Sequence, residues 1–187
     1  DLSANLIEDL DPLGALDVLA DLDLSGNTPL ADLAPLANLA GLTTLNLSDI
    51  SPFEDIGPLS SLTGLVDLSL SGNSPLQDLG PLAGLTALTQ LILADNDIED
   101  ISPLAALSQL RTLDLSDNLI ADTAALRNLT LTSLNLDGNQ VLDASPLPFG
   151  LNAAGVSALR QNGGALAATS GAAFEAPGPI TDFNGSQ

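Results

Sequence analysis

The sequence predicts an α/β solenoid, in which short units stack side by side along one axis. Leucine makes up 43 of the 187 residues, and these leucines recur in the phrase LxxLxLxxN. Chains that repeat at such a short period form arrays, because a single unit cannot bury its apolar face alone. Six phrases follow one another at steps of 23, 23, 23, 22 and 21 residues, beginning at Leu19, Leu42, Leu65, Leu88, Leu110 and Leu131.

Each phrase predicts a short strand with one apolar face. Leucines two positions apart point the same way from an extended backbone. Stacking then places the strands in a parallel sheet along one wall and joins their leucines into a continuous core. After the asparagine too few residues remain for a full helix and two turns, so we expect 3-10 or irregular turns on the opposite wall. We assign one partial and six full units to residues 1–147.

One asparagine per unit lies where the chain turns inward after the strand. An amide side chain can both donate to and accept from backbone groups, which a buried turn requires. Ile50 interrupts the series, and we expect a local defect there, with Ser48 or Asp49 as the substitute. The predicted amide ladder comprises Asn5, Asn27, Asn73, Asn96, Asn118 and Asn139.

One aspartate per unit precedes the turn phrase. We expect its carboxylate to accept backbone N–H groups of that turn, as a helix cap does. The alternative is cation binding, because stacked carboxylates lie ~5 Å apart and repel one another. This predicted aspartate ladder comprises Asp9, Asp32, Asp55, Asp78, Asp100, Asp122 and Asp143.

The densest acidic cluster is a candidate calcium site. It consists of Asp95, Asp97, Glu99 and Asp100. Calcium takes several oxygen ligands and tolerates flexible geometry, although the cluster lacks the glycine and the spacing of an EF-hand loop. We predict no cofactor, and calcium is the one alternative that stays open.

The composition excludes several classes of function. The chain has 24 acidic residues, three arginines and no lysine, so its formal net charge of −21 repels nucleic acids. It has no histidine or cysteine to act as a general base, a thiolate nucleophile or a usual zinc ligand. Paired carboxylates can hydrolyse glycosides, but here they form a repeated ladder without a substrate-stacking aromatic. No apolar run approaches the ~20 residues that span a bilayer. We therefore predict a protein that is not an enzyme and does not insert into membranes.

The combined strand and turn phrases resemble the bacterial internalin-type leucine-rich repeats. The segment NDIEDISPLAAL at residues 96–107 matches best, and the resemblance covers roughly residues 1–147. It implies a curved, right-handed leucine-rich-repeat solenoid with strands on its concave face. It also implies an extracellular or cell-surface location and a protein partner bound by that face. The partner's identity does not follow, because its contacts lie at variable positions.

The side chains that point outward from the predicted strands are small, polar and acidic. Binding hot spots are enriched in Trp, Tyr and Arg, so their scarcity here weakens the receptor-binding interpretation. Ile92 is the single large apolar residue, and one such residue is ordinary on a surface. The candidate binding residues are Asp21, Asp23, Thr44, Asn46, Asp67, Ser69, Gln90, Ile92, Thr112, Asp114 and Asn135.

The two ends depart from the repeat. From Pro148 the composition shifts to Ala, Gly and Asn. The spacing predicts a short helix over residues 151–162, within a C-terminal cap at 148–164, and an Ala/Gly/Pro-rich tail or linker at 165–187. The chain opens inside a strand phrase, so we expect either that an upstream part was removed or that this end meets another chain.

Two functions remain open. The first is a non-catalytic extracellular module that binds a protein or another ligand. The second is a structural, self-assembling surface or filament subunit that packs through its solenoid ends, with or without calcium.

Overall fold

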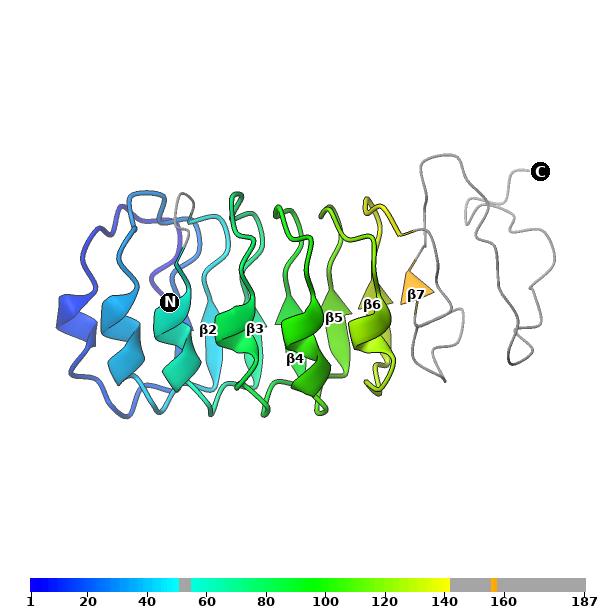
Figure 1. The fold of residues 1–187 in the computed structure, drawn as a ribbon. Helices are drawn as coiled ribbons and strands as arrows, with labels where there is room; N and C mark the ends of the chain where they lie inside the picture. Colours follow the sequence, from blue (N-terminus) through cyan, green and yellow to red (C-terminus); the bar gives the residue numbers. More distant parts are fainter. Residues whose placement is uncertain (51–54, 142–155, 158–187) are drawn as a thin grey trace, which may run out of the picture.

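The backbone winds into a row of similar coils, each carrying one short strand and one 3-10 turn (Figure 1). This computed structural model describes residues 1–50, 55–141 and 156–157. All strands are parallel and form one sheet in chain order. They are β1 (Asp21–Asp23), β2 (Thr44–Asn46), β3 (Asp67–Ser69), β4 (Gln90–Ile92), β5 (Thr112–Asp114), β6 (Ser133–Asn135) and β7 (Val156–Ser157).

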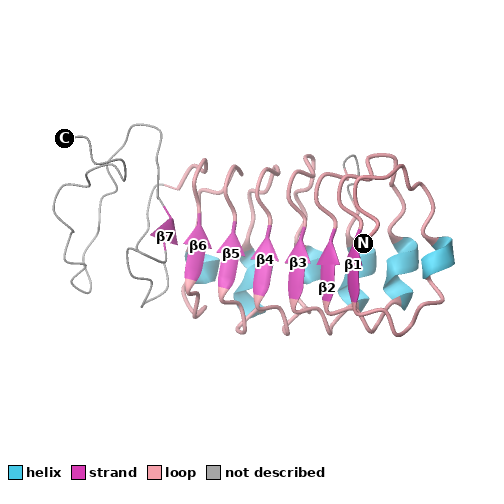
Figure 2. Ribbon diagram, turned by 180° about the vertical axis from the view of Figure 1, so that it is seen from behind, coloured by secondary structure: helices cyan, strands magenta, loops and turns pink. Residues whose placement is uncertain are grey.

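The 3-10 turns line the side opposite the sheet, which confirms the predicted return path (Figure 2). Proline is the second residue of each of the first five turns, because its fixed φ suits the first helical positions and an N–H there would have no partner within the turn. The turns are η1 (Asp11–Leu13), η2 (Ala34–Asn38), η3 (Gly57–Ser61), η4 (Gly80–Leu82), η5 (Ser102–Ala106) and η6 (Ala124–Leu126).

We call the outward side of β1–β6 the strand wall and the outward side of η1–η6 the turn wall. The central strand leucines pair in strict register, so that Leu22, Leu45 and Leu68 form one ladder across neighbouring strands. The sheet is open, and its strands stand in a row with little bend (Figure 2). A side chain at a given phase of the repeat therefore meets its equivalents from the units on either side.

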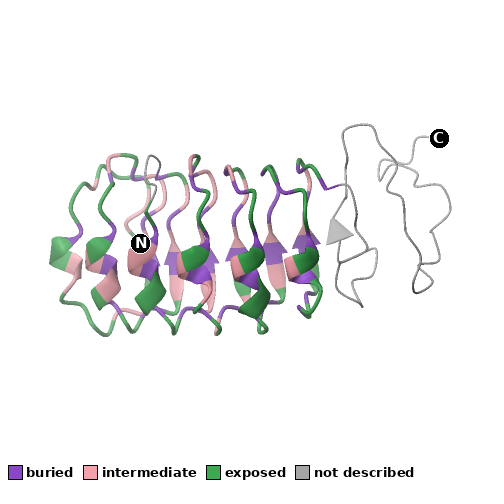
Figure 3. Cartoon of the chain, in the orientation of Figure 1, coloured by how far each residue is buried: buried purple, intermediate pink, exposed green. Residues whose placement is uncertain are grey.

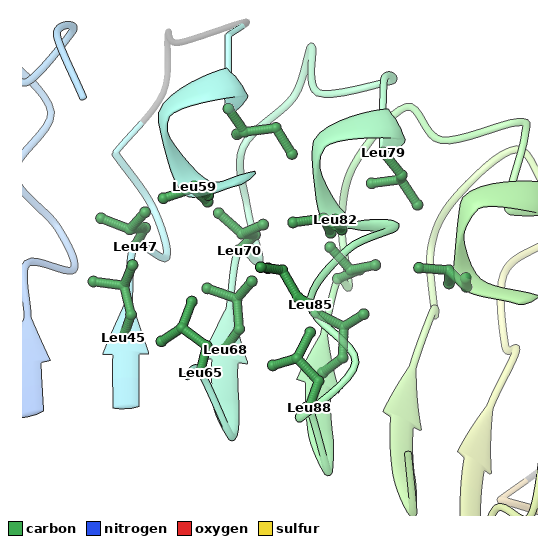
Figure 4. Packing of buried hydrophobic residues seen from close by; sticks show 14 of the residues in the cluster. Leu45, Leu47, Leu59, Leu65, Leu68, Leu70, Leu79, Leu82, Leu85 and Leu88 are labelled. Carbon is green, nitrogen blue, oxygen red and sulfur yellow. The ribbon is translucent and has the colours of Figure 1, made fainter. Parts of the chain in front are cut away.

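Leucines fill the space between the two walls. Buried and exposed residues alternate along each coil (Figure 3). In the close view, Leu68 and Leu70 from β3 and its continuation lie near Leu59 and Leu82 from the turns (Figure 4). All four are at most 1% exposed. Full burial of such a side chain contributes about 1.5–3 kcal/mol, so the core is the main source of stability.

The amide ladder is buried, as predicted, except at Asn5, which is exposed, and it links each unit to the one before. Asn118 Nδ2 donates to Leu115 O at 3.1 Å and to Leu93 O of the preceding unit at 2.9 Å. Its Oδ1 accepts the N–H of Ile98 at 3.1 Å. Leu93 O also accepts Nδ2 of Asn96 at 2.9 Å. A carbonyl in the unbroken part of the ladder is thus held by two amides.

The expected substitute for the missing amide at Ile50 is wrong. Ile50 is fully buried, and its N–H donates to Asn73 Oδ1 at 2.9 Å. Asn73 Nδ2 reaches back to Leu47 O at 2.8 Å. Ser48 instead shares a hydrogen bond with the Ser69 hydroxyl, and Asp49 lies against Gly72. A carbonyl at this position normally accepts from two asparagine amides. Ile50 supplies none, but Asn73 of the next unit still donates to Leu47 O.

A residue with a left-handed backbone conformation directly precedes each position of the amide ladder, including Ile50. Such a conformation favours glycine, and it turns the chain inward after the strand. At Gly72 a Cβ would also collide with the Asp49 carboxylate of the preceding unit. The residues with positive φ are Ala4, Gly26, Asp49, Gly72, Asp95, Asp117 and Gly138.

The predicted C-terminal helix is wrong at the two residues that the structure describes there. Val156 and Ser157 form β7, which pairs with β6 in register with Leu134 and Asn135. The open edge of β6 offers backbone partners to an extended segment, and this local advantage outweighs the helical spacing. The rest of the proposed helix, the tail at 165–187 and Asp143 lie outside the described residues. No helix in the described part of the chain is long and apolar enough to cross a bilayer.

Candidate functional site

The candidate binding residues lie on the strand wall in two ladders, as the repeat predicted. Equivalent residues of neighbouring strands are direct register partners, for example Asp67 with Gln90 and Ser69 with Ile92. Their role in binding stays a prediction. The first ladder is Asp21, Thr44, Asp67, Gln90, Thr112 and Ser133, and the second is Asp23, Asn46, Ser69, Ile92, Asp114 and Asn135.

At β1 and β2 the second ladder is held by hydrogen bonds. Asp23 Oδ1 accepts the N–H of Ser25 at 2.9 Å and its hydroxyl at 2.6 Å, and Asp23 Oδ2 accepts Asn46 Nδ2 at 3.1 Å. Burial raises the pKa of Asp23, but the hydrogen bonds from Ser25 and Asn46 outweigh it and leave the pKa below its usual value. Asn46 Oδ1 in turn accepts the N–H of Ser48 at 3.1 Å. Both side chains therefore serve the fold.

The same arrangement recurs at β5 and β6. Asp114 Oδ1 accepts the N–H of Ser116 at 2.9 Å and its hydroxyl at 2.7 Å, while Oδ2 accepts Asn135 Nδ2 at 3.2 Å. Asn135 Oδ1 accepts the N–H of Asp137 at 3.1 Å. We call these two hydrogen-bonded groups, at β1–β2 and β5–β6, the flanks. The phrase Asp-Leu-Ser occurs at residues 23–25 and 114–116, but also at 1–3 and 67–69, so it predicts these groups only where its aspartate ends a strand.

In the middle of the strand wall, at β3 and β4, the outward side chains make far fewer hydrogen bonds to described residues. From the described residues, Asp67 Oδ1 accepts only a long hydrogen bond, from the Thr89 hydroxyl at 3.5 Å. The Gln90 side chain is exposed and makes no hydrogen bond to a described residue, and Ile92 is partly exposed. Ser69 is the exception, since its hydroxyl pairs with that of Ser48 at 2.8 Å. We call Asp67, Gln90 and Ile92 the contact centre.

The strand wall carries negative charge, and neither arginine of the described residues pairs with one of its carboxylates. Arg111 Nη1 donates to the Leu110 carbonyl at 2.9 Å and to the Thr130 hydroxyl at 2.8 Å. Arg127, the other arginine of the described residues, directly follows η6 on the turn wall. Asp21 is exposed at the β1 end of the strand wall. This face therefore attracts cationic groups.

The aspartate ladder caps the turns, as predicted, in every unit that the structure describes. Each Oδ1 accepts the backbone N–H two residues later, which is the first residue of a 3-10 turn. In Asp100 the N–H and the hydroxyl of Ser102 lower the pKa of the carboxyl. The distances are 2.8 Å for Asp9, Asp32, Asp78, Asp100 and Asp122, and 2.6 Å for Asp55.

The four candidate calcium ligands are not gathered around one point. Within the described ranges, no group of three or more acidic side chains is placed to hold a metal ion. Asp97 Oδ2 accepts the Ser74 hydroxyl at 2.7 Å, and Asp100 caps η5. Asp95 is one of the left-handed residues, and Glu99 is exposed. Calcium binding by Asp95, Asp97, Glu99 and Asp100 stays a prediction.

Comparisons with known proteins agree with this architecture. A family model described as leucine rich repeats in two copies matches residues 86–128. No curated protein sequence matches the chain.

Many solved structures are similar to the chain, and the following three are among them. An internalin C2 from Listeria monocytogenes is 38% identical with a TM-score of 0.72, over 83% of this chain and 67% of that one. An internalin F from the same species is 36% identical with a TM-score of 0.61, over 75% and 48%. A leucine-rich-repeat protein from Leptospira interrogans is 25% identical with a TM-score of 0.63, over 73% and 35%. The chain, which spans only part of each relative, belongs to the internalin-like leucine-rich-repeat proteins.

Proposed function

We propose that the chain is a non-catalytic interaction module that binds a protein partner through its strand wall. One observation carries this proposal: the strand wall is a broad, regular face on which the contact centre contributes little to the fold. The turn wall differs, because each described carboxylate of its aspartate ladder caps a turn. Side chains that the fold does not use are available to a partner.

The absence of usual catalytic groups from the sequence supports a binding role. The whole chain lacks histidine, cysteine and tyrosine. The carboxylates that remain are distributed along ladders, and the aspartates of the turn wall are already acceptors for backbone N–H groups. The likeness to internalins further supports a location outside the cell, at the cell surface or secreted.

Site-directed photocrosslinking tests this function, since a chain without cysteine accepts one unique label. Thr112→Cys places a benzophenone on the strand wall, and Ser60→Cys places the same label in η3 on the turn wall. Each labelled chain is illuminated with a panel of purified extracellular domains. We expect defined adducts from position 112 only. Equal adduct yields from both positions would refute binding through the strand wall.

Self-assembly through the solenoid ends is the second candidate, favoured by apolar side chains at the first unit. Leu16 is 44% exposed, whereas its equivalents Leu39 and Leu62 are fully buried, and Val18 is 87% exposed. The charge of −21 opposes association between copies. Sedimentation velocity over a wide concentration range, with and without calcium, decides the matter. A concentration-independent monomer under both conditions would reject assembly.

A further inference from the structure

We propose that the strand wall recognises an arginine of its partner, and that the contact centre of Asp67, Gln90 and Ile92 receives it. This inference rests on the proposed function, because it names the partner chemistry for the same wall. Four lines of observation carry it: the placement of the three side chains, their free hydrogen-bonding capacity, their chemistry and the charge of the surroundings.

The three side chains are neighbours in the middle of the wall. Asp67 of β3 is the register partner of Gln90 of β4, and Ile92 follows Gln90 by two positions, on the same side of its strand. Figure 2 shows β3 and β4 side by side at the middle of the row. Neighbouring strands lie about 5 Å apart, and residues two positions apart on one strand lie about 7 Å apart. One long side chain can therefore contact all three residues.

The contact centre has hydrogen-bonding capacity that the flanks lack. Both carboxylate oxygens of Asp23 and of Asp114 accept hydrogen bonds within the wall. Asp67 Oδ2 accepts none from a described residue, and Oδ1 accepts only the long one from Thr89. Asp21 of β1 is similarly unengaged, but its neighbours on the wall include no large apolar side chain. Asp114 also lies beside an aliphatic group and an amide, those of Ile92 and Asn135, but both of its oxygens already accept hydrogen bonds. Among the described residues of the wall, the contact centre is where this combination occurs with a carboxylate oxygen still available.

Arginine matches this combination better than the other cationic side chains. Its planar guanidinium can donate two parallel hydrogen bonds to the Asp67 carboxylate, and a further N–H can reach the Gln90 carbonyl oxygen. Its methylene stem can pack on Ile92 while the charged head remains near water. Lysine offers a compact point charge without the fork, so it forms fewer simultaneous contacts.

The surrounding charge favours the same partner. Arg111 does not compete for Asp67, because its guanidinium is bound to backbone carbonyls and to Thr130. The net charge of −21 steers a cationic segment toward the molecule and repels a second copy of the chain.

Nuclear magnetic resonance of the full chain tests the inference with a defined probe. A glycine–serine peptide carrying one arginine is titrated into the nitrogen-15-labelled chain, beside the same peptide with neutral citrulline. We expect the arginine peptide to shift amide signals of β3 and β4, and the citrulline peptide to shift none. Shifts centred on the flanks, or equal effects of the two peptides, would overturn the inference.

A matched pair of variants separates a specific contact from general attraction. Asp67→Asn should weaken binding of the arginine peptide by about fivefold, as expected for an exposed ion pair. Asp78→Asn removes the same charge from the same repeat on the turn wall and keeps an oxygen to cap η4, so affinity should not change. Thermal unfolding of both variants verifies that they are folded. Equal weakening by the two substitutions would refute the contact centre.

The failure of this inference can be distinguished from the failure of the proposed function. If the label at position 112 crosslinks a partner and Asp67→Asn leaves that yield unchanged, the wall binds proteins but not through this arginine contact. If the labels on both walls react equally, the proposed function fails, whatever the peptide does.

Discussion

The flanks and the contact centre of the strand wall use the same repeat in opposite ways. Asp23 and Asp114 stand at the end of a strand, where the N–H two residues later is available to the carboxylate. Asp67 stands at the beginning of β3, and the residue two positions later, Ser69, lies within the sheet. The N–H of Ser69 donates to the neighbouring strand, so it is not available to the Asp67 carboxylate. A shift of two residues thus decides whether an aspartate stabilises the fold or stays available to a partner.

Of the substitutions considered, we expect the greatest loss of stability from one that disrupts a flank. Asp114→Ala removes the acceptor for the N–H and the hydroxyl of Ser116, which is 7% exposed. Buried donors left without acceptors should lower the free energy of unfolding by about 1–3 kcal/mol. Asp67→Ala, the control in the contact centre, should change it by less than about 0.5 kcal/mol. Urea unfolding measures both, and equal losses would contradict the distinction.

The dependence of the melting temperature on salt shows how strongly repulsion among the exposed acids destabilises the fold. Screening of repulsion among the acids should raise the melting temperature with sodium chloride, by ~3 °C if the gain is about 1 kcal/mol. Calcium chloride at the same ionic strength tests the candidate site at Asp95, Asp97, Glu99 and Asp100. A further rise that Asp97→Asn abolishes would support calcium binding, whereas identical curves would reject it. A melting temperature that responds to neither salt would show that the charge is not destabilising.

Double-mutant cycles compare the coupling free energy of one side-chain pair in a flank with that of one pair in the contact centre. Asp114→Ala and Asn135→Ala, alone and together, should give a coupling free energy of about 0.5 kcal/mol, because their side chains bond across the strands. The corresponding cycle on Asp67 and Gln90, which are register partners without a hydrogen bond between them, should give nearly zero. Equal couplings in urea unfolding would show that adjacency alone, and not hydrogen bonding, links such pairs.

The ladders were predictable from the sequence because the repeat fixes which way each residue points. The leucine phrase placed Asp67 beside Gln90 and Ser69 beside Ile92, and the capping role of Asp78 followed from its place before a proline turn. The expected substitute at Ile50 was wrong, because single-unit reasoning does not reveal that neighbouring asparagines share each carbonyl. The helix predicted around Val156 was wrong there, because its spacing says nothing about an open sheet edge.

The contact centre could not be recognised from the outward pattern alone. Asp23, Asp67 and Asp114 are equivalent in polarity and all face outward. Their difference lies in hydrogen bonds to residues in the next strand and beyond the strand end, such as Asn46 and Ser116. Asp23, Asp67 and Asp114 all begin an Asp-Leu-Ser phrase, so the phrase identifies the flanks only once the strand ends are known.

The smallest change that we expect is in how the unfolding free energy depends on pH, through Asp23 of one flank. The pKa of Asp23 is lowered in the folded protein, so the unfolded chain takes up a proton first as the pH falls. The stabilisation from this carboxylate is fully present above its unfolded pKa of about 4 and is lost as the pH drops through the lower folded value. The difference in unfolding free energy between the native chain and Asp23→Asn should therefore shrink in acid. A difference that grows in acid would contradict the assigned direction.

The most direct test of the division between flanks and contact centre requires no partner. Positions 23, 46, 67, 90, 114 and 135 are each randomised in the displayed chain, and folded variants are selected by their resistance to protease. We predict strong selection for the native side chains or close mimics at 23, 46, 114 and 135, and broad tolerance at 67 and 90. Equal tolerance at all six positions, or strict selection at 67 and 90, would contradict this prediction.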